Sequence, residues 1–79
     1  MSNLSERLNH LKIDRKLLQK TIAEENNIPL RTYQRYEYGE REPSLSTLIK
    51  LADYFNVSLD YLAGRTDEPV NPNITNNKI

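Results

Sequence analysis

The stretch that most constrains the fold is residues 19–38, QKTIAEENNIPLRTYQRYEY, which predicts two short helices joined by a tight turn. Asn26 and Asn27 stand at the turn, and asparagine tolerates a left-handed backbone at a helix end better than any residue except glycine. Pro29 then presets the backbone dihedral that opens the second helix. Two helices this short and this close must cross at a steep angle, and Ala23 is small enough to allow the crossing.

The second of these helices, expected over residues 30–37 after a first helix over residues 19–26, separates polar from aromatic side chains. At about 100° per residue, Tyr33 and Tyr36 fall on one side and can pack inward. The opposite side carries side chains of the kinds that contact base edges: Leu30, Arg31, Gln34 and Arg35. Arginine pairs with guanine, glutamine pairs with adenine, and leucine can meet a thymine methyl group. The pattern therefore predicts a helix-turn-helix that reads DNA, with an ordinary solvated face as the alternative.

Three further helices are expected around this pair, each beginning after a side chain that can cap it. They start at about residue 4 after Asn3, at residue 45 after Ser44, and at residue 59 after Ser58. Leucines at helical spacing give these segments an apolar stripe. Residues 66–79 are polar, contain two prolines and lack an apolar period, so they are predicted to be a flexible tail or a linker. The chain is thus expected to be all-α, with one compact five-helix domain over residues 1–65.

The composition excludes several classes of function. Seventy-nine residues make one domain whose core is too small to surround a sizeable substrate pocket. The chain has no cysteine and one histidine, His10, so neither a metal site nor a catalytic cluster is expected, and no cofactor is predicted. Glu24 and Glu25 point to different sides of a helix, which disfavours an enzyme with paired carboxylates. No segment is apolar enough to cross a membrane and no signal peptide is recognisable, so a cytoplasmic protein is expected.

The net charge is zero, which by itself argues against a nucleic-acid partner, but the charges are unevenly distributed. Residues 7–41 carry eight basic and five acidic side chains, a net of +3. Residues 42–79 carry three basic and five acidic side chains, a net of −2. Such a dipolar molecule can present a positive face to phosphate while it stays soluble.

Two helix ends carry polar side chains with a predicted role. Gln19 and Lys20 begin the first helix of the pair, where free backbone amides and the helix dipole favour a phosphate. Gln19 could instead cap that helix, and the two roles are compatible. Glu37 opposes the dipole at the end of the second helix, and a partner such as Lys12 would account for it.

Together these motifs resemble the Cro/CI-type (XRE-family) helix-turn-helix repressors. The matching segments are QKTIA at residues 19–23, TYQRYEYG at residues 32–39, REPS at residues 41–44 and LIKLADYFNVSLDYLAG at residues 48–64. With the first helix, the resemblance covers about four-fifths of the chain, from about residue 4 to residue 65. It implies a compact five-helix fold like that of the lambda repressor, which binds operator DNA, often as a two-fold dimer.

Position by position, the resemblance implies base contacts at Leu30, Arg31, Gln34 and Arg35. It implies phosphate contacts at Gln19 and from Tyr38 to Arg41, and a buried ion pair between Lys12 and Glu37. The chain departs from the family at four positions: Leu18 replaces a capping threonine or serine, Pro29 a small polar residue, Leu30 a frequent glutamine, and Glu40 a frequent lysine. An adenine contact at Leu30 is therefore not expected, and the phosphate contact at Glu40 is in doubt.

The chain is accordingly expected to be a sequence-specific DNA-binding transcriptional regulator that reads operator half-sites through the major groove. A repressor is the favoured form, but the sequence does not choose between repression and activation. Its predicted partners are a double-stranded DNA operator and a second copy of the chain, with half-sites about 34 Å apart. Tyr61 and Leu62 are the candidate contacts of that homodimer. The alternative is a helix-turn-helix protein-interaction module, such as an antitoxin or an anti-repressor component, which would use the exposed tyrosines Tyr38 and Tyr54.

Overall fold

Five helices follow one another between residues 3 and 69, which are the residues that the structure, a computed structural model, describes. They are α1 (Leu4–Asp14), α2 (Gln19–Glu25), α3 (Leu30–Tyr38), α4 (Leu45–Phe55) and α5 (Leu59–Leu62). No strand occurs in this range, so the predicted all-α class is confirmed. Most of the tail predicted at residues 66–79 lies outside the described residues. Within them, no helix is long and apolar enough to cross a membrane.

Three of the helices begin at a side chain that caps them. The caps of α1, α4 and α5 are Asn3, Ser44 and Ser58, whose side chains accept hydrogen bonds from a backbone amide at 3.1, 3.3 and 2.9 Å respectively. α3 and α4 end at residues with a left-handed backbone, Gly39 (φ 76°) and Asn56 (φ 58°). Because such a residue turns the chain away from the helix axis, these positions explain why both helices stop there.

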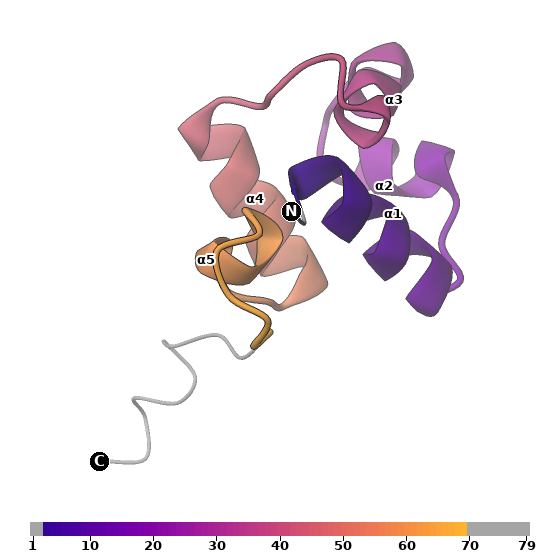
Figure 1. The fold of residues 1–79 in the computed structure, drawn as a ribbon. Helices are drawn as coiled ribbons and strands as arrows, with labels where there is room; N and C mark the ends of the chain where they lie inside the picture. Colours follow the sequence, from indigo (N-terminus) through magenta and orange to yellow (C-terminus); the bar gives the residue numbers. More distant parts are fainter. Residues whose placement is uncertain (1–2, 70–79) are drawn as a thin grey trace.

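The two central helices begin without a side-chain cap. Leu18 and Pro29 occupy the cap positions of α2 and α3, and neither makes a side-chain hydrogen bond there. Between the helices, Asn27 adopts the left-handed backbone predicted for this turn (φ 57°). The Ile28 amide donates to the Ala23 carbonyl oxygen at 2.9 Å, which closes the turn. Figure 1 shows the result, with α3 lying above α2 at one end of the molecule.

α1 lies between two pairs of helices, α2 with α3 and α4 with α5. It contacts α3 on one side and α5 on the other, while α2 packs against α3 and α4 packs against α5 (Figure 1). The apolar side chains that meet in the core are Leu8, Leu11, Ile22, Ala23, Ile28, Tyr33, Tyr36, Leu51, Ala52, Phe55, Val57, Tyr61 and Leu62. Since residues from all five helices contribute, the described chain has one hydrophobic core, and burial of this apolar surface is its main stabilising force.

The prediction that Tyr61 and Leu62 form a dimer contact is wrong, because both side chains lie inside the monomer. Leu62 is fully buried and Tyr61 is only 7% exposed. The guanidinium carbon of Arg7, from α1, lies 4.1 Å from the centroid of the Tyr61 ring and covers it. α5 is only four residues long, so its sequence pattern is too short to distinguish the inward side from the outward side.

The folded body continues past the predicted boundary at residue 65. Arg7 Nη2 donates to the Thr66 carbonyl oxygen at 3.1 Å and to Asp67 Oδ1 at 2.9 Å. The Ser58 amide donates to the Pro69 carbonyl oxygen at 3.1 Å. These contacts attach the segment after α5 to α1 and to the start of α5, and the hydrogen bond with Asp67 raises the pKa of Arg7.

Candidate nucleic-acid interface

α3 has one buried aromatic side and one exposed polar side, as its sequence predicts. Tyr33 is fully buried and Tyr36 nearly so, and the two rings anchor the helix in the core. On the other side, Arg31 and Arg35 are exposed and Leu30 is 40% exposed. A helix anchored by two large rings holds its outer side chains in a defined position relative to the body, which a surface that reads DNA requires.

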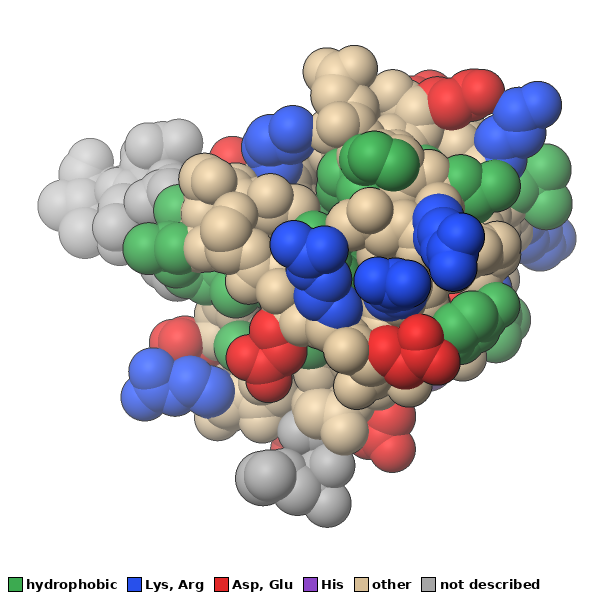
Figure 2. Space-filling view, turned by 90° about the horizontal axis from the view of Figure 1, so that it is seen from above, with side chains coloured by type: hydrophobic (Ala, Val, Ile, Leu, Met, Phe, Trp, Pro, Cys, Tyr) green, Lys and Arg blue, Asp and Glu red, His purple; other side chains and the backbone are tan. Residues whose placement is uncertain are grey.

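The outer side chains of α3 surround a shallow depression of about 210 Å³. Its lining residues are Arg31, Gln34, Arg35, Tyr38 and Glu40. Figure 2 views the molecule from the end at which α3 lies and shows Lys and Arg side chains across the middle of this face, with acidic side chains directly beside them. The structure therefore brings three of the predicted base-contacting residues together, and Leu30 begins the same helix.

A chain of polar contacts connects this face to the core. Lys12 Nζ lies 3.0 Å from Glu37 Oε1, so the structure contains the predicted ion pair, and the Glu37 side chain is only 2% exposed. Gln19 Nε2 donates to the same carboxylate oxygen at 2.9 Å, and Gln34 Nε2 donates to Gln19 Oε1 at 3.1 Å. The suggestion that Gln19 caps α2 is therefore wrong, because its amide is occupied by two side chains of α3.

Glu37 has a strongly asymmetric environment. Its second oxygen, Oε2, is buried without a hydrogen-bond partner among the described residues, and so is the Tyr33 hydroxyl. Burial raises the pKa of the Tyr33 phenol far above its usual value, and the nearby Glu37 carboxylate adds to the rise. Tyr33 therefore stays neutral, and Lys12 and Gln19 are the two donors that hold the carboxylate in place.

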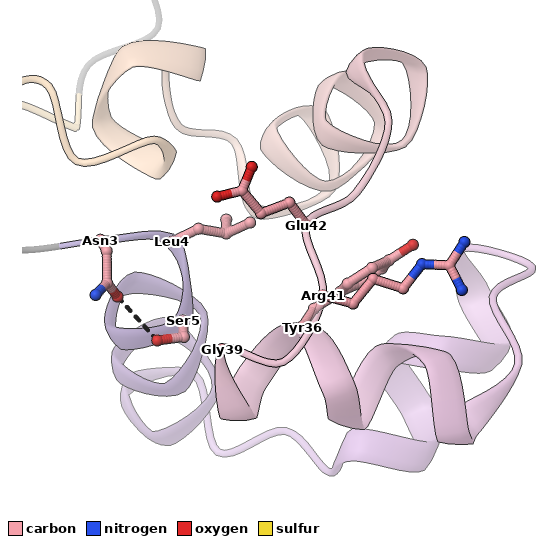
Figure 3. A pocket seen from close by; sticks show the side chains of 7 residues that line it. All are labelled: Asn3, Leu4, Ser5, Tyr36, Gly39, Arg41 and Glu42. Carbon is pink, nitrogen blue, oxygen red and sulfur yellow. Dashed lines mark hydrogen bonds between the residues drawn. The ribbon is translucent and has the colours of Figure 1, made fainter.

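The residues predicted to contact phosphate lie at or near the ends of α2 and α3. Lys20 is exposed in the first turn of α2, and Tyr38, the last residue of α3, is 62% exposed. Arg41 is exposed in the loop after Gly39. Figure 3 shows its side chain extending away from a hollow of about 130 Å³ between this loop and the start of α1. Glu40 is also exposed and places a negative charge beside it, which weakens attraction for phosphate there.

One contact that the sequence does not indicate connects α4 with α2. The Tyr54 hydroxyl donates to Glu25 Oε1 at 2.6 Å. This hydrogen bond, with a smaller contribution from burial, raises the pKa of Tyr54 to about 12. The two residues are 29 positions apart, so no local pattern predicts the pairing. Residues 3–69 contain no group of three or more His, Asp or Glu side chains placed to hold a metal ion.

Comparisons with known proteins place this arrangement among transcriptional regulators. A helix-turn-helix family model matches residues 10–62. The uncharacterized HTH-type transcriptional regulator YqaE of Bacillus subtilis is 40% identical over 67 residues, which cover 84% of this chain and 58% of that protein. The cryptic phage CTXphi transcriptional repressor RstR of Vibrio cholerae is 44% identical over 59 residues, which cover 68% of this chain and 53% of that protein. The chain spans little more than half the length of either relative.

A solved structure shares the fold. The crystal structure of a transcriptional regulator from Listeria innocua matches with a TM-score of 0.76 and 36% sequence identity, over 96% of this chain and 71% of that chain. The five-helix architecture predicted from the sequence is therefore confirmed by an experimental structure of a similar protein.

Proposed function

Because this chain belongs to the XRE-type helix-turn-helix family of transcriptional regulators, we propose that it is a sequence-specific DNA-binding repressor that acts in the cytoplasm by occupying an operator. The observation that best supports the proposal is the outer side of α3, where two arginines and a glutamine surround one depression on a helix anchored in the core. The major groove of B-DNA admits an α-helix, and a protein seated there obstructs the polymerase.

Each outward side chain of α3 suits a particular base. Arg31 and Arg35 carry planar guanidinium groups that can donate two hydrogen bonds to guanine O6 and N7. Gln34 can accept from adenine N6 and donate to adenine N7, and Leu30 can contact a thymine methyl group. A good bidentate pair is worth about 1–3 kcal/mol of discrimination, so these few contacts are sufficient to select a site.

Contacts to the DNA backbone would come from both ends of the helix pair. Lys20, in the first turn of α2, and Arg41, in the loop after α3, are exposed cations, and Tyr38 offers an exposed hydroxyl. Gln19 would contribute through whatever hydrogen-bonding capacity its two bonds to α3 leave free. Such contacts set the position of the protein on the duplex and carry no sequence information themselves.

A homodimer would read two half-sites about 34 Å apart, and α4 offers the surface for it. Leu45 and Ile49 are one helical turn apart on α4 and are 65% and 44% exposed. The other exposed aliphatic pair, Ile13 and Leu18, adjoins the start of α2, where Lys20 would face the DNA backbone. The face that α4 presents is therefore the better contact for a second copy.

The dimer surface can be tested by sedimentation velocity with and without operator DNA. Ile49→Glu is expected to abolish the dimer on DNA, because it places a charge in the apolar contact. Asn9→Glu, which adds the same charge at an exposed residue of α1, is expected to leave the dimer intact. A wild-type protein that binds its operator as a monomer would contradict the homodimer.

The proposed function is tested by selecting binding sites from random double-stranded DNA. The wild type is expected to enrich a palindromic motif, and the Arg31→Ala/Arg35→Ala double variant is expected to lose it. The control is Lys50→Ala/Arg65→Ala, which removes the same charge from exposed positions outside α2 and α3.

Arg35→Ala alone should cost about 1–3 kcal/mol at the selected site and relax the preference at one base pair. Affinity should also fall steeply as salt concentration rises, since bound phosphates release counterions. A wild-type protein that enriches no motif and shows no salt dependence would rule out the repressor and point instead to a protein partner.

A further inference from the structure

The polar contacts between the core and the outer side of α3 form one series of hydrogen bonds, called the hydrogen-bond chain below, in which each donor and acceptor is defined. It runs from Lys12 in α1 to Glu37 at the end of α3, then to Gln19 in α2, and back to Gln34 in α3. The three N···O distances are 3.0, 2.9 and 3.1 Å, all within ordinary hydrogen-bond range. The last residue of the hydrogen-bond chain, Gln34, lines the depression where bases are proposed to bind.

The direction of this chain follows from donor and acceptor chemistry. A carboxylate paired with a lysine can only accept hydrogen bonds, so Gln19 must offer Glu37 its NH₂ group. The carbonyl oxygen of Gln19 then faces Gln34, and an oxygen can only accept. Gln34 must therefore donate through its own NH₂ group. The Glu37 carboxylate therefore determines the orientation of both amides.

The orientation of the Gln34 amide determines which donor and acceptor groups it can present to DNA. One N–H of its NH₂ group is used by Gln19, and the other N–H and the carbonyl oxygen remain. Adenine presents one acceptor, N7, and one donor, N6–H, in the major groove. Guanine presents two acceptors, N7 and O6, which call for two donors. The groups left free on Gln34 match adenine and do not match guanine.

We propose that Glu37 and Gln19 are positioning residues that orient the Gln34 amide and thereby make it select adenine. Lys12 contacts the same Glu37 oxygen at 3.0 Å and holds in place the carboxylate from which the hydrogen bonds run. The proposal rests on the proposed function, because it concerns how one base-contacting residue of that site acquires its specificity.

The test measures relative affinity for the four bases at one position of the selected operator. Gln34→Ala first identifies the base pair whose preference depends on Gln34. The wild type should prefer adenine there by roughly 5- to 150-fold, the range of a good bidentate pair. Glu37→Gln lets both glutamines turn over, because an amide at position 37 can either donate or accept. It should lower the adenine preference at least five-fold while the preferences at other base pairs persist.

A second variant guards against misfolding of the first. Gln19→Met keeps the size of the side chain and leaves the Lys12–Glu37 pair in place, but breaks the link to Gln34. It should also lower the adenine preference at that single position, whereas loss of a phosphate contact would weaken binding to all sequences equally. Glu24→Gln, an equal change of charge at an exposed residue of α2, should leave every preference unchanged.

The outcomes separate this inference from the proposed function. A wild-type motif that Gln34→Ala does not alter overturns the inference alone, because Gln34 then reads no base. Folded Glu37→Gln and Gln19→Met variants that keep the wild-type adenine preference also overturn it and leave the repressor intact. Should Glu37→Gln fail to fold, Gln19→Met decides. No motif from the wild type would overturn both.

Discussion

Two helices, α2 and α3, are proposed to face DNA and are called the reading helices below. They and the three supporting helices are held in place by different means. α1, α4 and α5 each begin at a polar side chain that caps the first turn. α2 and α3 begin at Leu18 and Pro29, without such a cap, and are joined instead through Gln19 and the buried Glu37. The supporting helices are therefore specified by adjacent residues, whereas the reading helices depend on contacts made across the fold.

Because of this difference, the polar side chains that stabilise the supporting helices are not those proposed to recognise DNA. A capping side chain satisfies the amides at a helix start, and the supporting helices use it for stability alone. The reading helices leave those amides without a side-chain partner and place their polar side chains where they also face outward. Because α2 and α3 lack side-chain caps, their stability depends on tertiary contacts. Substitutions in the two regions should therefore differ in the size of their effect on the free energy of unfolding and in the interaction that they remove.

The largest effect should come from breaking the ion pair between Lys12 and Glu37, which holds α3 against α1. Lys12→Ala leaves a carboxylate with a 2% exposed side chain without its cation, and it should lower the free energy of unfolding by about 3–5 kcal/mol. Urea denaturation measures the loss. Lys50→Ala, at an exposed lysine of α4, is the matched control and should change stability by less than about 0.5 kcal/mol. Equal denaturation midpoints for the two variants would show that the pair contributes nothing.

The helix crossing gives the next largest effect. Ala23 is 1% exposed, and its carbonyl accepts the hydrogen bond that closes the turn before α3. Ala23→Leu should overpack this position and lower stability by about 1–3 kcal/mol, as measured by thermal unfolding. Ala63→Leu, at an exposed alanine just after α5, should have little effect. A wild-type melting temperature for Ala23→Leu would contradict the close approach of α2 and α3.

Exchanging the two kinds of helix start tests the comparison directly. Ser44→Ala removes the cap of α4 and should cost about 0.5–2 kcal/mol. Leu18→Ser supplies a cap to α2 at a residue that is 69% exposed and already has an extended backbone, and it should stabilise the protein by about 1 kcal/mol. Denaturation curves of both variants give the signs. A destabilised Leu18→Ser variant would show that the start of α2 is held by something other than its missing cap.

The smallest effect concerns the hydrogen bond that joins the two regions. Tyr54→Phe removes the bond to Glu25 and should cost about 0.5–1.5 kcal/mol at neutral pH. Because folding raises the Tyr54 pKa from 10 to about 12, the bond stabilises the protein fully below pH 10 and is lost as the pH rises through 12. The difference in stability between wild type and variant should therefore shrink between pH 10 and pH 12. A difference that stays constant over this range would contradict the contact.

Local residues account for most of the fold that the sequence predicts. Asn3, Ser44 and Ser58 start helices where expected, and Asn27 adopts the left-handed backbone at the expected turn. These residues act on the backbone of their immediate neighbours, so their effect can be predicted from a short window of sequence. The exposed side of α3 is predicted for the same reason, because helical periodicity alone separates its arginines from its tyrosines.

The contacts that the sequence does not predict join residues far apart in the chain. The bond from Gln34 to Gln19 spans 15 positions, and that from Arg7 to Thr66 spans 59. Tyr61 is mistaken for a surface residue because the side chain that covers it, Arg7, comes from a different helix. Long polar side chains can adopt many conformations, so their partners depend on how the helices pack rather than on spacing.

The hydrogen bond between the Ser58 amide and the Pro69 carbonyl oxygen has a practical consequence. It holds Pro69, the last described residue, next to the start of α5. α5 lies at the end of the molecule away from α3 (Figure 1). A fluorophore, a surface tether or a fused protein attached at Pro69 would therefore lie far from α3, the helix proposed to enter the DNA groove. Immobilisation through this end should leave the reading helix free to approach DNA, whereas a tether at the exposed Lys20 should block it.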